Sequence, residues 1–169
     1  DSWVPEREPL REALCTLGNG FFATRGADEE SKADGIHYPG TYIGGGYNRL
    51  ESEIAGKIIE NEDLVNWPNW LPLNFRPEEG DWLDLNEMEV LEFRQDLDAR
   101  QGVLERYLKV RDGAGRETSL VCRRFVSMAR PHLAVILWDW TPENWSGRVL
   151  FRSAIDGTVK NTGVARYRD

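Results

Sequence analysis

The second half of the chain alternates apolar and polar residues with the period of two that is typical of β-strands. Residues 90–95 alternate in this way, as do residues 103–111 and 117–128 on either side of a turn at residues 112–115, Asp-Gly-Ala-Gly. These two runs joined by a Gly-rich turn predict a β-hairpin. In its second arm, one face is predicted to carry Thr118, Leu120, Cys122, Arg124 and Val126.

Residues 133–137 are apolar without interruption, which predicts a strand buried on both faces. Residues 149–155 alternate again after the turn at residues 141–147. Helical periodicity is nearly absent, and only residues 6–16, with Leu10 and Leu14 four positions apart, predict a short helix. At most one or two short helices are therefore expected, and short strands separated by Gly, Pro and Asp turns predict an all-β protein, an antiparallel β-sandwich.

The first half contains a Gly-rich block, Leu17–Gly26, whose composition suits neither a helix nor a central strand. Asn19 followed by Gly20 is a favoured tight-turn pair, so the block predicts a turn that leads into a buried strand ending at Arg25. The alternative interpretation is a hairpin turn that carries a surface arginine and has no function.

Four further segments complete the first half. Residues 28–35 are charged and turn-forming, and they predict an exposed loop. Residues 37–48 predict a strand that bends at three consecutive glycines, and residues 51–62 predict an acidic, polar loop. Two prolines and two tryptophans in residues 64–73 exclude a helix interior and predict an extended, rigid segment.

Composition narrows the functional classes. The 169 residues contain 21 Lys and Arg against 29 Asp and Glu, a net charge of −8, and no basic run, so nucleic acid is not a predicted partner. The chain has no apolar run of membrane-spanning length, and its first residues lack the pattern of a signal peptide. Neither a membrane partner nor secretion is therefore predicted. With Cys15 and Cys122 interpreted as buried reduced thiols, a cytoplasmic location is expected.

The candidate catalytic groups do not form a recognisable set. Two histidines, His37 and His132, lack neighbours at metal-ligand spacing, and Ser127 lacks the glycines of a nucleophile elbow. No catalytic residue, metal site or cofactor is therefore predicted. Paired carboxylates are the groups that glycoside hydrolysis uses, but most of those available lie in acidic turns and are interpreted as solvated. They are Glu29, Glu30, Glu51, Glu53, Asp81, Asp84 and Asp139.

Seven tryptophans are unusual for this length, and two of them lie on the rigid segment. Trp67 and Trp70 are suited to stack on a sugar ring, while Asn66 and Asn69 are suited to bind its hydroxyl groups. The alternative interpretation is that both rings close the edge of the sandwich or face another domain. The two interpretations predict either a sugar site or a domain interface for these four residues.

Taken together and in this order, several segments resemble the N-terminal domain of glycoside hydrolase family 65, which includes maltose, trehalose and kojibiose phosphorylases and acid trehalases. Each segment is weak alone, but the series spans almost the whole chain. The segments are Leu17–Gly26, Asp28–Glu30, Gly40–Ile43, Glu62–Trp70, Leu97–Leu104, Arg124–Met128 and Ser153–Gly157 with Asn161.

The resemblance implies a large β-sandwich packed against an (α/α)6 barrel that this chain lacks. In that family the acid glutamate and the site for phosphate or water belong to the barrel, so no catalytic residue is carried over. Residues 1–169 are expected to be a truncated, N-terminal β-sandwich of a larger enzyme and to be inactive alone. Phosphorylases of the family use inorganic phosphate as co-substrate and invert the anomeric centre, whereas its hydrolases use water.

The resemblance also implies partners: the missing barrel, a second subunit in a homodimer, and an α-glucosidic disaccharide bound by the whole enzyme. Phe22-Ala23-Thr24 and Trp67 depart from the family pattern, which leaves the substrate class open. The predicted role is to support the barrel and subunit assembly, and the alternative is an independent carbohydrate-binding module. Asn19 and Arg25 are predicted to face the barrel.

Overall fold

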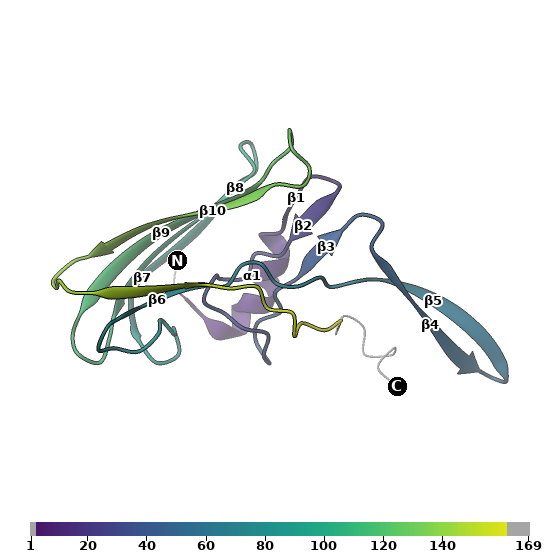
Figure 1. Cartoon of the computed structure of the whole chain (residues 1–169), viewed down its shortest axis with the longest axis horizontal. Coiled ribbons are helices and arrows are strands. Elements are labelled where there is room, and N and C mark those ends of the chain that lie inside the picture. The colour runs from purple at the N-terminus through teal and green to yellow at the C-terminus, as the bar shows by residue number, and fades with distance from the viewer. Residues whose placement is uncertain (1–2, 162–169) are drawn as a thin grey trace.

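The computed structural model describes residues 3–161 and shows an all-β architecture with antiparallel strand pairing (Figure 1). This confirms the predicted fold class. A short 3-10 helix, Pro5–Arg7, precedes the helix α1, Glu8–Leu14. The predicted truncation at Asp169 lies outside the described residues. The strands are β1 Leu17–Gly18, β2 Phe22–Thr24, β3 Thr41–Ile43, β4 Tyr47–Ile54, β5 Lys57–Leu64, β6 Leu73–Pro77, β7 Glu89–Asp98, β8 Val103–Arg111, β9 Glu117–Val126, β10 Ala134–Pro142 and β11 Val149–Ser153.

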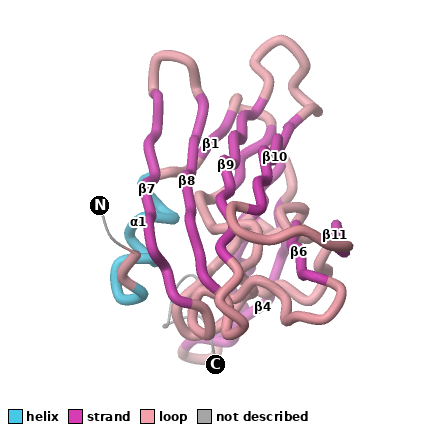
Figure 2. The backbone as a smooth tube through the Cα atoms, turned by 90° about the vertical axis from the view of Figure 1, so that its left-hand side faces the viewer, coloured by secondary structure: helices cyan, strands magenta, loops and turns pink. Residues whose placement is uncertain are grey.

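The main sheet has the strand order β10-β9-β8-β7, and the two-stranded β11-β6 sheet lies against one of its faces (Figures 1 and 2). In register, Leu108 of β8 lies between Phe93 of β7 and Leu120 of β9, so these three side chains share the inner face. Phe75 of β6 packs on them from the second sheet. Their burial supplies the hydrophobic stabilisation of the sandwich. The core is Phe75, Leu83, Leu85, Phe93, Leu108, Val110 and Leu120.

The predicted hairpin of β8 and β9 is confirmed, with Asp112 Oδ1 accepting hydrogen bonds from the backbone of Ala114 and Arg116 in the turn. The prediction that residues 133–137 are buried on both faces is wrong. They enter β10, an edge of the main sheet, and the side chain of Leu137 is 52% exposed. Continuous apolarity therefore marks an edge strand with an uncovered outer face, and not a central strand.

The Gly-rich block folds as predicted into a turn and a strand. β1 and β2 pair as a hairpin, Gly20 has a φ of 84°, and Arg25 follows β2 directly. Gly26 next to it permits a close approach, because a Cβ atom there would lie 2.5 Å from the Cβ of Cys15. β3 pairs with β2 to complete a three-stranded sheet, in which the hydroxyls of Thr24 and Thr41 are buried.

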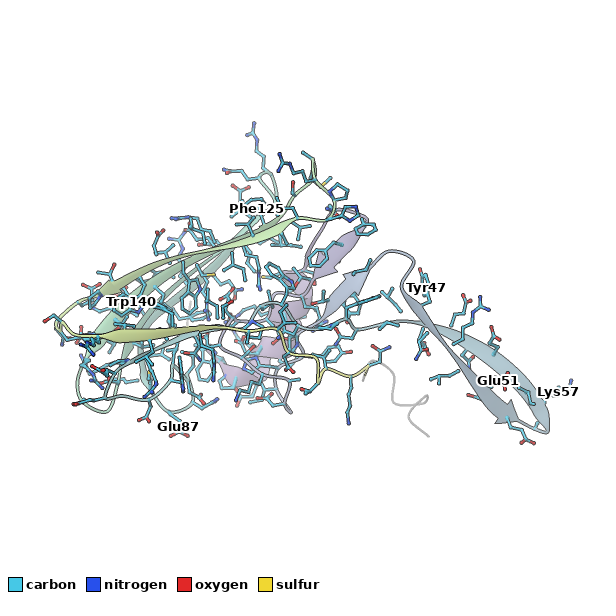
Figure 3. The ribbon with its side chains drawn as sticks, viewed as in Figure 1. Tyr47, Glu51, Lys57, Glu87, Phe125 and Trp140 are labelled. Carbon is cyan, nitrogen blue, oxygen red and sulfur yellow. The ribbon has the colours of Figure 1, made fainter. Side chains whose placement is uncertain are left out.

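Residues 51–62 were predicted to be a loop, and this is wrong, because they belong to the long hairpin of β4 and β5. The turn at Ala55 and Gly56 has φ values of 53° and 75°, as a two-residue hairpin connection requires. We call residues 47–64 the arm. It projects away from the rest of the molecule, with Tyr47 at its base and Lys57 near its tip (Figures 1 and 3).

The predicted helix exists, but its amphipathic character is reversed. Leu10 and Leu14 are 64% and 68% exposed, whereas Glu8 and Glu12 are 1% and 0% exposed. A surface helix ordinarily buries its apolar stripe and presents its charges to water. The charged partners that hold the two glutamates inside belong to the site described next.

Candidate functional site

Three consecutive carboxylates converge on one buried guanidinium in the interior of the sandwich. Arg106 lies 3.1 Å from Asp28, 2.8 Å from Glu29 and 2.6 Å from Glu30, and all four side chains are at most 4% exposed. The prediction of an exposed loop over residues 28–35 is therefore wrong at its start. Burying a charged group is costly unless hydrogen bonds to an opposite charge offset the loss of hydration. Arg106 donates such hydrogen bonds to Glu29 and Glu30.

The strand period explains why these charges point inward. Arg106 lies between Leu104 and Leu108 on the inner face of β8, directly opposite Cys122 of β9. Arg124, two residues beyond Cys122, faces the same interior, donates to the carbonyl of Ala27 at 3.1 Å and lies 3.6 Å from Glu29. Because alternate residues of a strand share a face, two arginines are carried inside with the apolar residues.

A second group of buried charges joins α1 to the loop at His37. His37 Nδ1 donates to Glu12 Oε1 at 2.9 Å, and the backbone N–H of Tyr38 donates to Glu12 Oε2 at 2.9 Å. Arg25 lies 3.7 Å from the same carboxylate, and Glu8 pairs with Arg11 at 2.8 Å. Glu12 is thus held inside by cationic and N–H partners from the loop and from the end of β2, whereas the partner of Glu8 is Arg11 of the helix itself. We call these residues and the Arg106 cluster together the ionic network.

The ionic network shifts proton affinities in opposite directions. Burial raises the pKa of Asp28 to about 7, against the attraction of Arg106. Burial also acts to raise the pKa of Glu29, but Arg106 and Arg124 outweigh it and hold that pKa below its ordinary value. For His37, burial acts to lower the pKa, and the hydrogen bond to Glu12 outweighs it, so the pKa is raised. Burial also raises the pKa of Glu8. Asp28, with a pKa of about 7, is thus the member of the network whose charge changes near neutral pH.

We expect the free energy of unfolding to fall as the pH rises from about 5 to 8. A carboxyl group whose folded pKa lies above its unfolded value stabilises the fold fully below the unfolded pKa, near 4, and loses that contribution as the pH rises through about 7. The raised pKa of His37 acts in the same sense from its unfolded value of about 6.5 upward. Urea titrations between pH 5 and 8 measure this decline, which has a limit of about 1.4 kcal/mol per pH unit for each proton.

The matched variant for this measurement is Asp28→Asn, because its amide does not titrate. Its stability should change less steeply with pH than that of the wild type between pH 5 and 7. Stability that rises over this range in the wild type, or the same slope in both proteins, would contradict the assignment to Asp28.

A cavity of about 260 Å3 lies beside the ionic network, with Asp28 and Glu30 in its wall. The indole rings of Trp3 and Trp82 also line it. The guanidinium of Arg152 lies 4.4 Å from the centre of the Trp82 ring and belongs to the same wall. The network therefore supports one side of a polar hollow, but its carboxylates are held by Arg106 and do not form a free acid and base pair.

The remaining candidate carboxylates are spread over separate elements. Glu51 and Glu53 lie on β4 of the arm, and Asp139 of β10 pairs with Arg123 at 2.9 Å on the outer face of the main sheet. Asp81 and Asp84 are exposed in the connection between β6 and β7. The structure brings Glu29 and Glu30 together around Arg106, and Asp84 lines the same cavity as Glu30.

Asn19 and Arg25 both make hydrogen bonds within the chain. Asn19 Nδ2 donates to the carbonyls of Ser127 and Pro131, at 2.7 and 3.1 Å, which ties the β1–β2 turn to the β9–β10 connection. Arg25 Nε donates to the carbonyl of Tyr38 at 2.8 Å. Both side chains are thus positioned by their own domain, and a contact with a catalytic barrel remains a prediction.

The four residues of the rigid segment are close in space but differ in exposure. Asn66 and Asn69 are buried, and their side-chain oxygens accept hydrogen bonds from the backbone N–H groups of Thr41 and Leu71. Trp67 is 39% exposed, whereas Trp70 is half-buried and packs edge-to-face on Phe22 at 6.0 Å. The two amide oxygens hold the backbone in place, Trp67 has the more exposed ring, and a sugar-site or interface role for this segment remains a prediction.

Sequence reasoning did not single out Arg106 or Glu12, and it placed Arg124 on one face of its strand with Leu120 and Cys122 without assigning it a role. The available signal was a charged residue at an apolar position of an alternating strand, as for Arg106 between Leu104 and Leu108. Such a charge needs a buried partner. That partner, the acidic run at residues 28–30, is more than 70 residues away in the sequence and had been interpreted as solvated.

These observations define an antiparallel β-sandwich domain with a charged interior and a projecting arm. The chain belongs to the glycosyl hydrolase family 65 N-terminal domain family, whose model matches residues 1–169. No helix within residues 3–161 is long and apolar enough to cross a membrane.

Several longer proteins are similar to the chain. An uncharacterized glycosyl hydrolase of Mycobacterium tuberculosis is 49% identical over 164 residues, which cover 97% of this chain and 12% of that protein. Kojibiose phosphorylase of Caldanaerobacter subterraneus subsp. tengcongensis is 37% identical, with 93% of this chain and 19% of that protein covered. Trehalose 6-phosphate phosphorylase of Lactococcus lactis is 34% identical, with 98% and 21% covered. The chain thus spans 12% to 21% of the length of these relatives.

A solved structure has the same fold. It is described as a kojibiose phosphorylase candidate from the human microbiome, and it matches with a TM-score of 0.74 at 22% sequence identity. The match covers 83% of this chain and 19% of that one.

Proposed function

We propose that this chain is the non-catalytic N-terminal domain of a cytoplasmic family 65 phosphorylase that acts on α-glucosidic disaccharides. Its role is to support the catalytic barrel and subunit assembly. The observation that carries this proposal is the reversed helix α1, which is anchored through Glu12 and presents Leu10 and Leu14 outward.

The exposed apolar face of α1 is suited to pack against another part of the polypeptide. Leu10, Ala13 and Leu14 are spaced by three and four residues and therefore form one apolar strip on the helix. Removing a leucine side chain from water contributes about 1.5–3 kcal/mol, so covering the strip is favourable. The helix cannot turn the strip inward without breaking the contacts of its buried glutamates. Because relatives of the chain are five to eight times longer, we assign the covering surface to the catalytic region of the same polypeptide.

The proposed reaction belongs to that region and not to this domain. Two of the relatives that the chain matches are named kojibiose phosphorylase and trehalose 6-phosphate phosphorylase, which supports a disaccharide substrate with inorganic phosphate as co-substrate and no further cofactor. In phosphorolysis, a phosphate oxygen bonds to the anomeric carbon, the glycosidic bond breaks, and a carboxylic acid protonates the leaving oxygen. Within the ionic network the carboxylates are buried and paired, so they support the fold.

The proposal is tested by comparing this chain with the complete polypeptide that contains it. With kojibiose, trehalose or maltose and inorganic phosphate, the complete polypeptide should release glucose 1-phosphate, and this chain alone should release none. The double variant Leu10→Ser, Leu14→Ser should weaken packing on the catalytic region and lower the melting temperature of the complete polypeptide. The same change in this chain alone should leave its stability nearly unchanged.

Three results would contradict the proposal. Turnover by this chain alone would make it an enzyme. Saturable quenching of tryptophan fluorescence by these sugars in this chain would favour an independent carbohydrate-binding module that uses Trp67. If the double variant Leu10→Ser, Leu14→Ser of the complete polypeptide had an unchanged melting temperature, α1 would not pack against the catalytic region. A complete polypeptide that hydrolyses the sugars without phosphate would keep the domain role and change the reaction class.

A further inference from the structure

The arm has exposed apolar side chains along its length. Leu50 and Ile54 are 56% and 57% exposed, and Ile58 and Ile59 are 72% and 42% exposed. A two-stranded hairpin is at best marginally stable by itself in water, and it gains stability when a face is covered. We propose that the arm is a self-association surface, at which the arms of two copies of this chain pack face to face around a two-fold axis.

The two faces of the arm differ in charge. In register, the pairs Tyr47 with Leu64, Arg49 with Glu62, Glu51 with Glu60 and Glu53 with Ile58 form one face, which has a net charge of −3. Arg49 is already paired on that face, with Glu62 at 2.7 Å and Glu60 at 3.2 Å. Because this face carries excess negative charge, it would repel the same face of a second copy.

The opposite face has no net charge, and Leu50, Ile59 and Ile54 form an apolar stripe along it. Its pairs, from base to tip, are Asn48 with Asp63, Leu50 with Asn61, Ser52 with Ile59, and Ile54 with Lys57. Leu50, Ile59 and Ile54 thus alternate from strand to strand along the face. A single carboxylate lies at the base and a single ammonium group at the tip, so the charges of this face cancel.

This pattern is self-complementary when two arms pack in opposite directions. A two-fold axis midway between the second and third of these four pairs places the tip of each arm over the base of the other. Lys57 then lies over Asp63 of the second copy, and Leu50 lies over Ser52 of the second copy. Each apolar side chain meets a smaller or polar residue, and the charge contact occurs twice by symmetry. Parallel packing would instead place like charges together.

The contact between two arms is too small to form a stable dimer by itself. A strand pair of eight residues is about 27 Å long and roughly 10 Å wide, which gives about 270 Å2 per copy. A stable interface buries about 800 Å2 per partner. The arms alone therefore form a weak dimer, which other contacts reinforce in a complete polypeptide. This inference rests on the assembly role proposed above and uses a surface separate from α1.

Charge exchange is the sharpest test, because it separates contacts within a chain from contacts between chains. Lys57 and Asp63 lie on the same strand six residues apart, roughly 20 Å, so they do not pair within one arm. Sedimentation equilibrium of this chain, at up to millimolar concentration and about 0.15 M salt, measures the dimer. Lys57→Glu and Asp63→Lys should each weaken it about tenfold, which corresponds to about 1.4 kcal/mol. The double exchange should restore the wild-type value.

Two further variants complete the test. Leu50→Ser with Ile59→Ser should abolish the dimer, and Glu51→Gln on the opposite face should leave it no weaker. A wild-type chain that stays monomeric at millimolar concentration, or a double charge exchange that does not restore association, would overturn the inference. A dimer weakened by Leu10→Ser and Leu14→Ser and not by the arm variants would place self-association at α1 instead. None of these outcomes depends on whether the complete polypeptide is a phosphorylase.

Discussion

Replacing Arg106 by methionine should lower the free energy of unfolding by about 3–5 kcal/mol, because removing one partner of a buried ionic group leaves its opposite charges uncompensated. Three carboxylates share this guanidinium, and they are at most 4% exposed. Domains of this kind are stable by only about 5–15 kcal/mol, so the variant should lose a large part of its stability. Urea unfolding followed by tryptophan fluorescence measures the difference.

Arg123→Met is the matched control for this experiment. Arg123 lies on the outer face of β9, 43% exposed, and pairs with Glu105 at 2.6 Å and Asp139 at 2.9 Å. It therefore also has carboxylate partners, but water solvates them when the arginine is removed, and the expected cost is at most about 1 kcal/mol. Equal losses for the two variants would mean that burial does not decide the value of these contacts, and the ionic network would have no special structural role.

Changing a glutamate on α1 should cost more than changing both of its exposed leucines, which reverses the usual order for a surface helix. Glu12→Gln keeps the size of the side chain but removes the charge that His37, Arg25 and the N–H of Tyr38 share. Leaving such buried partners poorly satisfied costs about 2–3 kcal/mol. Leu10→Ser with Leu14→Ser should change the stability of this chain by about 0.5 kcal/mol or less, since both side chains are already in water.

The measurement is again urea unfolding of this chain, with Glu6→Gln in the preceding 3-10 helix, where the side chain is exposed, as the control for losing one acidic residue. If the two serines cost more than Glu12→Gln, the leucines would be part of the core and the helix would have the ordinary orientation. That result would also remove the surface on which the proposed packing against the catalytic region depends.

Local patterns predicted much of the fold because strands and turns depend on short stretches of sequence. The alternation in β8 and β9 and the Asp-Gly-Ala-Gly turn between them predicted that hairpin, and Asn19-Gly20 predicted the turn before β2. The residues grouped on one face of β9, including Arg124, do share a face, and the structure shows that this face is the buried one. In these cases the side-chain period and the turn residues act within a few residues, so no distant partner is needed.

Prediction failed where a distant partner decides the outcome. Residues 28–30 have the composition of a solvated turn, but in the structure they are buried because they pair with Arg106, which lies 76 to 78 residues away in the sequence. Residues 51–62 are polar enough for a loop, but their pairing across Ala55-Gly56 makes the arm. Residues 133–137 are apolar enough for a central strand, but the strand order of the sheet places them at its edge. The proposed sugar-site residues show the same limit, since Asn66 binds the backbone of Thr41.

The sequence by itself determined the class of fold, the positions of most strands and turns, and the resemblance to one family, because these depend on periodicity and on ordered local motifs. Only the tertiary structure decided which charges are buried, which way α1 faces, and that the arm stands free of the sandwich. The physical reason is that the cost of burying a charge depends on partners that the fold brings together. Glu6 lies in the 3-10 helix and Glu12 in α1, and of these two glutamates only the one that meets His37 and Arg25 is inside.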